Sequence, residues 1–317
     1  MNMPGFTTHY LIGQKLSCYI KDERLNQIIA RNKNAFNAGL QGPDLFFYNI
    51  IFVAGPVSRN VGKQMHEHKT GAFFEHFLTR SEGLEMRKDR EIAISYFLGF
   101  LCHYTLDTRI HPYVYARCGI SGVDEDAFAK HTHLESVLDV CLLKRERNLL
   151  PSAFHQTKTL ALNKRELAVI SDLMDHTIRD LYGLSPQYRI SYGFMKLGTF
   201  LLHDNTGLKR KAALFLEQNV FHSTMAANLI QTDSCKDTMD AFNQSHRCYR
   251  NPWAPEKKSR QSVFDMIEDS CLVYQHYTDA CTPYLCSIVA NLPKHDRRKL
   301  TFSTIGSLSY HNGIPCF

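Results

Sequence analysis

Long segments in which apolar residues recur every three or four positions dominate the chain, and this spacing is typical of amphipathic helices. The most apolar segment runs from Arg90 to Thr108, lacks proline and is hydrophobic on nearly all sides, which predicts a buried central helix. Pro112 cannot donate a backbone hydrogen bond within a helix, so we expect this helix to end near His111. The pattern predicts an all-α fold built around this helix.

Helical spacing also recurs in the rest of the chain. A second helix is predicted to begin after Asp124 or Asp126, either of which can cap it, and to include His131 and Glu135. The second half shows the same spacing in segments separated by polar turns, namely Arg165 to Tyr182, Tyr192 to His203, Lys209 to Gln218, Ser262 to Tyr277 and Cys281 to Asn291. Residues 231–260 lack it and are expected to form a long surface loop.

Trp253, the only tryptophan, lies between Pro252 and Pro255 in this expected loop. A tryptophan at such a place is either an anchor in the core or part of the wall of a substrate site. Because large aromatic side chains are mostly buried, the core anchor is the favoured interpretation.

Composition and charge add little to this picture. The chain has 317 residues, of which 44% are hydrophobic and 21% charged, as expected of an ordinary globular protein. The net charge is +6, and the lysine and arginine residues are scattered among acidic residues. The densest basic clusters are Lys144 to Arg147, Lys209 to Lys211 and Lys294 to Lys299, and we interpret them as solvated helix faces. A phosphate-bearing substrate or an anionic surface is the alternative partner for them.

The sequence favours a cytoplasmic protein. The N-terminal residues lack the basic and apolar regions of a signal peptide. The longest apolar stretch, Ile92 to Leu106, is interrupted by polar residues and is shorter than the ~18 to 20 residues that span a bilayer. The 10 cysteines form no CxxC pair, so we expect reduced thiols and no transmembrane segment.

Candidate chemistry is concentrated in histidine and acidic residues of the first half. His103, Asp107 and His111 follow one another at intervals of four along the predicted buried helix, so they share one stripe of its surface. Burying a carboxylate among imidazoles is costly unless a cation offsets the lost hydration. His131 and Glu135 repeat the same interval in the next helix. Imidazole and carboxylate groups at this spacing are typical zinc ligands.

Two upstream residues extend this candidate zinc site. Asp44 follows the turn at Gly42 and Pro43 and precedes an aromatic run, which predicts a carboxylate aimed into a cleft. A helix cap is the alternative role for Asp44. His9 begins a short apolar stretch and is either a further zinc ligand or an ordinary core histidine.

These motifs, in this order, resemble those of the zinc-dependent phospholipase C family, whose helical fold is shared with single-strand nucleases of the S1/P1 type. The resemblance is to a cytoplasmic, bacterial-type member. The matching segments are Thr8 to Gly13, Gly42 to Asp44, Met65 to Gly71, Phe97 to Asp107 with His111 and Pro112, and His131 to Glu135.

The resemblance implies a set of zinc ligands in a helical cleft. His103 and Asp107 would be the central pair, with Asp107 shared between two ions. The implied ligands are His9, Asp44, His66, His103, Asp107, His111, His131 and Glu135. His66 is favoured over His68 as the ligand from its segment, and both remain open.

The number of ions implied is two or three. His111, His131 and Glu135 would hold one zinc, while Asp44 and His66 would complete another around the central pair. His9 would hold the last ion together with Asp107. In exported family members that ion is also bound by the amine of a mature N-terminal tryptophan, which this sequence does not present.

The resemblance implies a phosphodiester hydrolase that uses a metal-activated water. Zinc lowers the pKa of a bound water toward ~7, and Asp44 is the candidate residue that orients or deprotonates it. A phospholipid is the favoured substrate. A single-strand nuclease or nucleotide phosphatase, with a nucleic acid or nucleotide as partner, is the first alternative, and a non-catalytic, metal-stabilised binding protein is the second.

The resemblance also suggests a division of the chain. Residues 1–150 would form the zinc-binding catalytic core. Residues 151–317 contain no further metal motif and are expected to be a helical remainder that completes the same domain.

Overall fold

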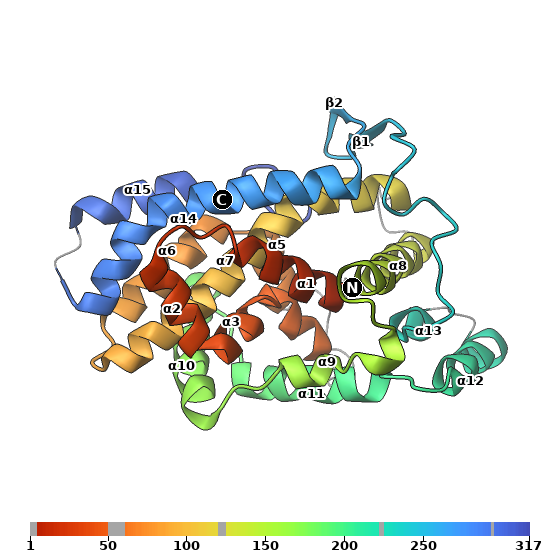
Figure 1. The fold of residues 1–317 in the computed structure, drawn as a ribbon, viewed down its shortest axis with the longest axis horizontal. Coiled ribbons are helices and arrows are strands. Elements are labelled where there is room, and N and C mark those ends of the chain that lie inside the picture. The colour runs from red at the N-terminus through yellow and green to blue at the C-terminus, as the bar shows by residue number, and fades with distance from the viewer. Residues whose placement is uncertain (1–4, 50–60, 120–124, 222–224, 293–294) are drawn as a thin grey trace.

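The computed structural model describes residues 5–49, 61–119, 125–221, 225–292 and 295–317, and these are mostly helical (Figure 1). The helices of the first half are α1 (Phe6–Ser17), α2 (Glu23–Arg31), α3 (Lys33–Gly39), η1 (Gly42–Tyr48), α5 (Val61–Glu67), α6 (Thr70–Glu82), α7 (Arg87–Cys118) and α8 (Glu125–Arg147). Those of the second half are η3 (Pro151–Ala153), α9 (Gln156–Thr159), α10 (Lys164–Tyr182), α11 (Tyr188–Leu202), α12 (Leu208–Leu216), η4 (Glu217–Phe221), α13 (Met225–Leu229), α14 (Val263–Ala290) and α15 (His295–Ile305). The predicted all-α fold class is therefore confirmed.

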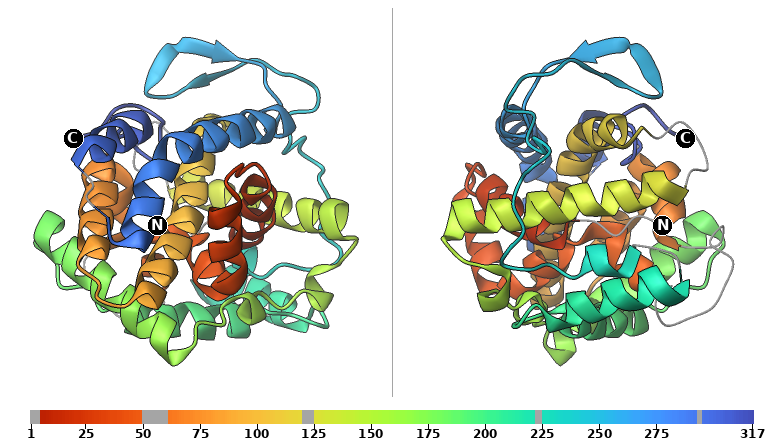
Figure 2. Two further views of the ribbon diagram at one scale, coloured as in Figure 1. Left: turned by 60° about the vertical axis from the view of Figure 1, so that its left-hand side comes forward. Right: turned by 90° about the vertical axis from the view of Figure 1, so that its right-hand side faces the viewer.

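Helix α7 is the centre of the molecule. Its side chains from Ile92 to Thr108 are all buried, as the apolar pattern of the sequence predicts. Helices α1, α3, α6, α8, α10 and α14 surround it (Figures 1 and 2). Within the described part of the chain, none of the helices has a stretch long and apolar enough to traverse a bilayer.

The predicted end of the central helix near His111 is wrong, because α7 continues through Pro112 to Cys118. Proline removes the backbone donor that would reach the carbonyl of Thr108, and its ring crowds that carbonyl, at a cost of about 3 kcal/mol. The residues beyond it, Tyr113 and Val114, are almost fully buried, and their packing stabilises the continued helix. His111 consequently lies inside a helix rather than at its end.

A second proline is accommodated in the same way. The segments 262–277 and 281–291, predicted as separate helices, form the single helix α14 with Pro283 inside it. Ser262 and Asp265 cap its first turn reciprocally. Beyond the proline, Tyr284 and Leu285 are fully buried. Burial on both sides of Pro283 therefore outweighs the local preference for a break.

The expected loop at residues 231–260 contains a small antiparallel hairpin, with strands β1 (Tyr249–Asn251) and β2 (Ala254–Ser259). This hairpin projects from the helical body (Figure 2). Trp253 lies at its turn and is 44% exposed, with its ring edge-on to that of Tyr115 at 5.1 Å between centroids. The favoured interpretation of Trp253 as a core anchor is wrong, because a projecting turn offers only one side for packing.

Two glycines allow α3 and α7 to touch backbone to backbone. A Cβ atom on Gly39 would lie 2.2 Å from the carbonyl oxygen of Tyr96, and one on Gly99 would lie 2.2 Å from that of Phe36. Any larger residue would push the helices apart. Since η1 begins three residues after α3 ends, this close approach also fixes the position of Asp44 relative to α7.

Helix α8 is observed where the sequence predicts it, beginning at Glu125. Asp124, one of its two candidate caps, lies outside the described residues, as does the side chain of Asp126. Near the start of the part of α8 whose side chains are described, His131 is fully buried.

Candidate metal centre

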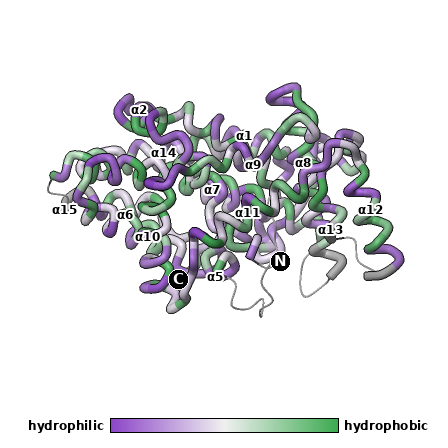
Figure 3. Tube along the Cα trace, turned by 90° about the horizontal axis from the view of Figure 1, so that it is seen from below, coloured by the Kyte–Doolittle hydropathy of each residue, from purple (hydrophilic) through white to green (hydrophobic). Residues whose placement is uncertain are grey.

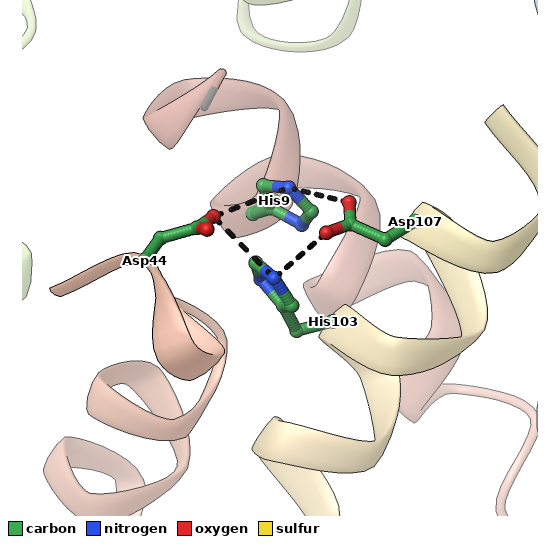
Figure 4. A group of neighbouring side chains, drawn as sticks. All are labelled: His9, Asp44, His103 and Asp107. Carbon is green, nitrogen blue, oxygen red and sulfur yellow. Dashed lines mark ion pairs between the residues drawn. The ribbon is translucent and has the colours of Figure 1, made fainter. Parts of the chain in front are cut away.

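Three elements bring His9, Asp44, His103 and Asp107 together in the interior (Figure 4). His9 Nε2 lies 3.1 Å from Asp107 Oδ1, and His103 Nε2 lies 3.0 Å from Asp107 Oδ2. Asp44 Oδ2 is 3.4 Å from His103 Nε2 and 3.9 Å from His9 Nε2. The rings of His9 and His103 stack with centroids 4.0 Å apart. All four side chains are buried, so their nitrogen and oxygen atoms converge on one small volume.

The turn before Asp44 is shaped by the ring of His103. Gly42 has a positive φ of 49°, and a Cβ atom there would lie 2.4 Å from the His103 ring. Only glycine fits this conformation and this contact. His103 Nδ1–H donates to the carbonyl of Leu40 at 3.1 Å, which directs Nε2 toward the two carboxylates.

His66, on α5, joins the same group. Its Nε2 lies 3.1 Å from Asp44 Oδ1 and 3.6 Å from Asp107 Oδ2, and its Nδ1–H donates to the carbonyl of Gly62 at 2.7 Å. His68 instead lies at the surface, with its Nε2 4.0 Å from Glu67 Oε2 and a side chain that is 53% exposed. Of the two histidines left open by the sequence, the structure places His66 at the candidate metal centre.

A second group consists of His111, His131 and Glu135. Glu135 Oε1 lies 3.3 Å from His111 Nε2 and 3.0 Å from His131 Nε2. The helical interval of four places His131 and Glu135 side by side on α8, and α7 supplies His111 from across the interface. His111 Nδ1 is also 3.7 Å from Asp107 Oδ2, so the two groups adjoin.

Within these groups the imidazoles lower the pKa values of Asp107 and Glu135, and nearby carboxylates raise the pKa of His66. Burial alone would raise the pKa of Asp107, but the imidazoles of His103, His111 and His9 lower that pKa well below its usual range. Burial likewise disfavours a charged His66, yet Asp107 and Asp44 raise the pKa of its imidazole to about 10. The pKa of Glu135 is lowered to about 2 against the effect of burial, chiefly by His131. The carboxylates of Asp107 and Glu135 are therefore anionic and attract cations.

The polar atoms of the centre fit a metal ion better than they fit one another. Several of them are fully buried and have no hydrogen bond with proper geometry to any described residue, although they lie close together. These atoms are Asp44 Oδ1 and Oδ2, His66 Nε2, His103 Nε2, Asp107 Oδ2, His131 Nε2 and Glu135 Oε2. Buried atoms of this kind are costly unless something coordinates them, and imidazole nitrogen with carboxylate oxygen is a typical donor set for zinc.

The C-terminal segment supplies contacts that the sequence did not predict. The carbonyl of Tyr310 accepts from His111 Nδ1–H at 2.9 Å, and the Tyr310 N–H donates to the carbonyl of His66 at 3.0 Å. Ser309 Oγ–H donates to the same carbonyl. His311 is largely buried between the rings of His66 and His111. This segment lacks helical periodicity, so no sequence signal could have placed it beside the first half of the chain.

Asp139 is a second residue that sequence reasoning missed. Its carboxylate oxygens accept from the N–H groups of Thr7 and Thr8 at 3.1 and 2.7 Å, which holds the start of α1 and so positions His9. The available signal was its interval of four from Glu135, which places both on one side of α8.

Two hollows reach the centre and share Gly5 and Glu135. The lining of the first includes the candidate ligands His9, Asp107, His111 and Glu135 and the apolar residues Leu106, Ile110, Val114 and Leu138. The lining of the second includes Glu135, Tyr48, Gln156, Leu202 and Leu229. The candidate ligands are thus reachable from outside through surfaces that are partly apolar.

Comparison with known proteins places this chain in a family. No curated protein sequence and no solved structure matches it. The sequence model described as zinc dependent phospholipase C matches residues 8–197, more than half of the chain and the part that contains every residue of both groups. The chain therefore belongs to the zinc-dependent phospholipase C family of phosphodiester hydrolases.

Proposed function

We propose that the protein hydrolyses a phospholipid phosphodiester with two or three zinc ions held by the two buried groups. The observation that carries this proposal is the contact of Asp107 with both groups. Its Oδ1 faces His9, while its Oδ2 faces His103 and lies 3.7 Å from His111. A carboxylate in this position can serve two neighbouring ions, which is the arrangement used for phosphodiester cleavage.

The ligands divide between the groups in this proposal. Asp44, His66, His103 and Asp107 would hold one ion. The group of His111, His131 and Glu135 would hold a second ion, and His9 with Asp107 would hold a third. Zinc supplies Lewis acidity, which lowers the pKa of water and neutralises charge on a phosphodiester.

Asp44 is the proposed proton acceptor. Both of its carboxylate oxygens are buried and face different partners, Oδ1 toward His66 and Oδ2 toward His103. One oxygen can therefore bind a metal while the other orients the attacking water and accepts its proton. The carbonyls of Leu40, Gly62 and Tyr310 keep three imidazoles in a fixed orientation, so their Nε2 atoms stay available as ligands.

The family description and the walls of the first hollow support a lipid substrate. Leu106, Ile110, Val114 and Leu138 contribute apolar lining to the hollow that also contains candidate ligands. An apolar wall suits the glycerol and acyl part of a phospholipid, whereas the metal side suits its phosphate.

Replacement of Asp107 tests the proposal. Asp107→Asn is expected to lower the zinc content by more than one ion per chain and to reduce phosphatidylcholine hydrolysis by about 10²-fold or more, since the shared ligand loses its charge. Metal analysis and a phosphate-release assay measure the two effects. Asp279→Asn, which changes an exposed ion pair with Lys21, is the matched control and should change neither. Full zinc content and activity in Asp107→Asn would contradict the assignment, and preferential cleavage of single-stranded oligonucleotides would identify a nuclease instead.

We further propose that the protein works in a reducing compartment such as the cytoplasm. None of the 10 cysteines, all of which lie within the described residues, forms a disulfide, and Cys102, Cys271 and Cys281 are buried in the core. Buried thiols outside disulfides are typical of proteins that fold in reducing surroundings.

A further inference from the structure

Helices α11 and α12 expose large apolar side chains on their outer sides. On α11, Ile190, Leu197, Phe200 and Leu201 recur at helical intervals, and Phe200 is 65% exposed. On α12, Leu208 and Phe215 are 64% and 65% exposed. We call these six side chains the apolar face. Single exposed apolar residues are common, but a set of this size on two successive helices indicates a binding surface.

The charges around the apolar face are positive. Between Tyr188 and Leu216 the sequence contains the cations Arg189, Lys196, Lys209, Arg210 and Lys211. Asp204 is the one acidic residue of this segment, and it is buried, where it accepts from the N–H groups of Gly207 and Arg210 at the start of α12. The exposed charge of the segment is therefore entirely basic.

The two helices follow one another along the same side of the molecule. Lys209 Nζ donates to the carbonyls of Leu201 and His203, so the start of α12 is held against the end of α11. Both helices lie along the lower edge in Figure 1, opposite α14. Figure 3 views this side, with hydrophobic positions in green.

The apolar face adjoins an entrance to the metal centre. The lining of the second hollow includes both the candidate ligand Glu135 and Leu202, the last residue of α11. Leu201, a member of the apolar face, is the immediate chain neighbour of Leu202. A lipid headgroup held against the end of α11 would consequently lie near a hollow that also borders a candidate metal ligand.

We propose that the apolar face and its cations dock the protein on an anionic lipid surface. Phe and Leu side chains enter the boundary between headgroups and acyl chains, while Lys and Arg bind the anionic headgroups. The absence of exposed acids from this segment favours a lipid surface over a protein partner of mixed charge. This inference rests on the proposed function, because it supplies that site with its substrate at the bilayer.

Vesicle binding by the full-length protein tests the apolar face. Wild type is expected to co-sediment with phosphatidylglycerol/phosphatidylcholine vesicles, and Phe200→Ser/Phe215→Ser should weaken this partition about tenfold or more. Leu272→Ser is the matched control, because Leu272 is 61% exposed on α14 at the opposite side. Binding that is absent in wild type, or equal in both variants, would overturn the proposal. Conversion of a dimer to a monomer by Phe200→Ser/Phe215→Ser, without a change in vesicle binding, would show that the face joins two copies of the chain.

Charge reversal tests the cations independently. Arg189→Glu/Lys211→Glu should weaken binding to phosphatidylglycerol vesicles by at least about fivefold per position, and Lys88→Glu/Lys299→Glu, with the same change in net charge at exposed sites elsewhere, should have little effect. An equal loss of vesicle binding in both double variants would overturn the docking site.

A soluble short-chain phosphatidylcholine separates this proposal from the proposed function. Docking variants should hydrolyse it at the wild-type rate, whereas failure of the zinc-loaded wild type to hydrolyse it would contradict the function and leave the vesicle result standing.

Discussion

At the scale of single residues, the centre depends on carboxylates that each serve more than one imidazole. Glu135 Oε1 contacts both His111 and His131, and the two oxygens of Asp107 face four histidines. Because every member is buried, removing one leaves charged or polar groups without compensation. Substitutions here should therefore affect metal binding and stability together.

Glu135→Ala should remove one zinc ion per chain and destabilise the fold by about 3–5 kcal/mol, since two imidazoles are left beside an incomplete site. Metal analysis and thermal unfolding with and without zinc measure this. Glu268→Ala removes an exposed partner of Lys15 and should cost no more than about 1 kcal/mol. If Glu135→Ala matches that control, Glu135 is not a metal ligand.

Protons and zinc should compete for the same histidines. In the metal-free protein the pKa of His66 is raised to about 10 and that of His111 to about 9, both by nearby carboxylates and against the effect of burial. Both imidazoles are thus protonated at pH 7. Their raised pKa values stabilise the metal-free fold, with the full effect below the ordinary histidine pKa of about 6.5. This contribution is lost as the pH rises through 9 to 10. Zinc binds only the neutral imidazoles, so the zinc affinity of the protein falls as the pH decreases.

Calorimetry of zinc binding in buffers of different ionisation enthalpy measures this competition. We expect release of about two protons per chain at pH 7 and little release above pH 10. If the heat of zinc binding at pH 7 is the same in every buffer, these imidazoles are neutral before zinc binds.

At the scale of elements, the contact between α3 and α7 sets the geometry of the site. The helices touch through Gly39 and Gly99, and the chain then turns through Gly42 to deliver Asp44 to His103. The position of Asp44 therefore depends on a contact between helix backbones that contains none of the ligands.

Gly99→Ala should destabilise the protein by about 1–3 kcal/mol, because its Cβ would meet the Phe36 carbonyl, which belongs to rigid backbone. It should also weaken zinc binding by moving η1. Gly193→Ala is the control within a helix, since a Cβ there meets nothing within 4 Å, and it should stabilise by about 0.5–1 kcal/mol. Urea unfolding compares the two, and equal effects would argue against the close approach.

At the scale of the whole molecule, the second half of the chain holds the first half together. Helix α14 packs along α7, and the backbone of Tyr310 bonds both His66 and His111. We propose on this basis that residues 1–150 and 151–317 form one folding unit.

A single unfolding transition is the expected consequence. Trp253 fluorescence reports on the contact of the second-half hairpin with Tyr115 of α7, whereas circular dichroism reports on all helices, so the two signals should change at one urea concentration together with zinc release. Two separate midpoints would show that the halves unfold independently.

The sequence by itself determined the helical fold class and most of the candidate site. His103 with Asp107, and His131 with Glu135, could be paired from their spacing alone, because the helix repeat places residues four apart on one side. Asp44 and His9 were proposed from the turn and apolar stretch around them, and the resemblance to the family joined them to the same centre.

Only the tertiary structure decided how these segments meet. Pro112 was expected to end a helix, and residues 262–277 and 281–291 were expected to form two helices, but in both places the buried flanking residues stabilise one continuous helix more than the proline inside it destabilises it. The selection of His66 over His68 depends on the packing of α5 against η1, and the contacts of Ser309 and Tyr310 join segments 199 to 243 positions apart. Local spacing fixes what lies on one helix, whereas contacts between distant segments follow from which surfaces bury one another, and that is a property of the folded chain.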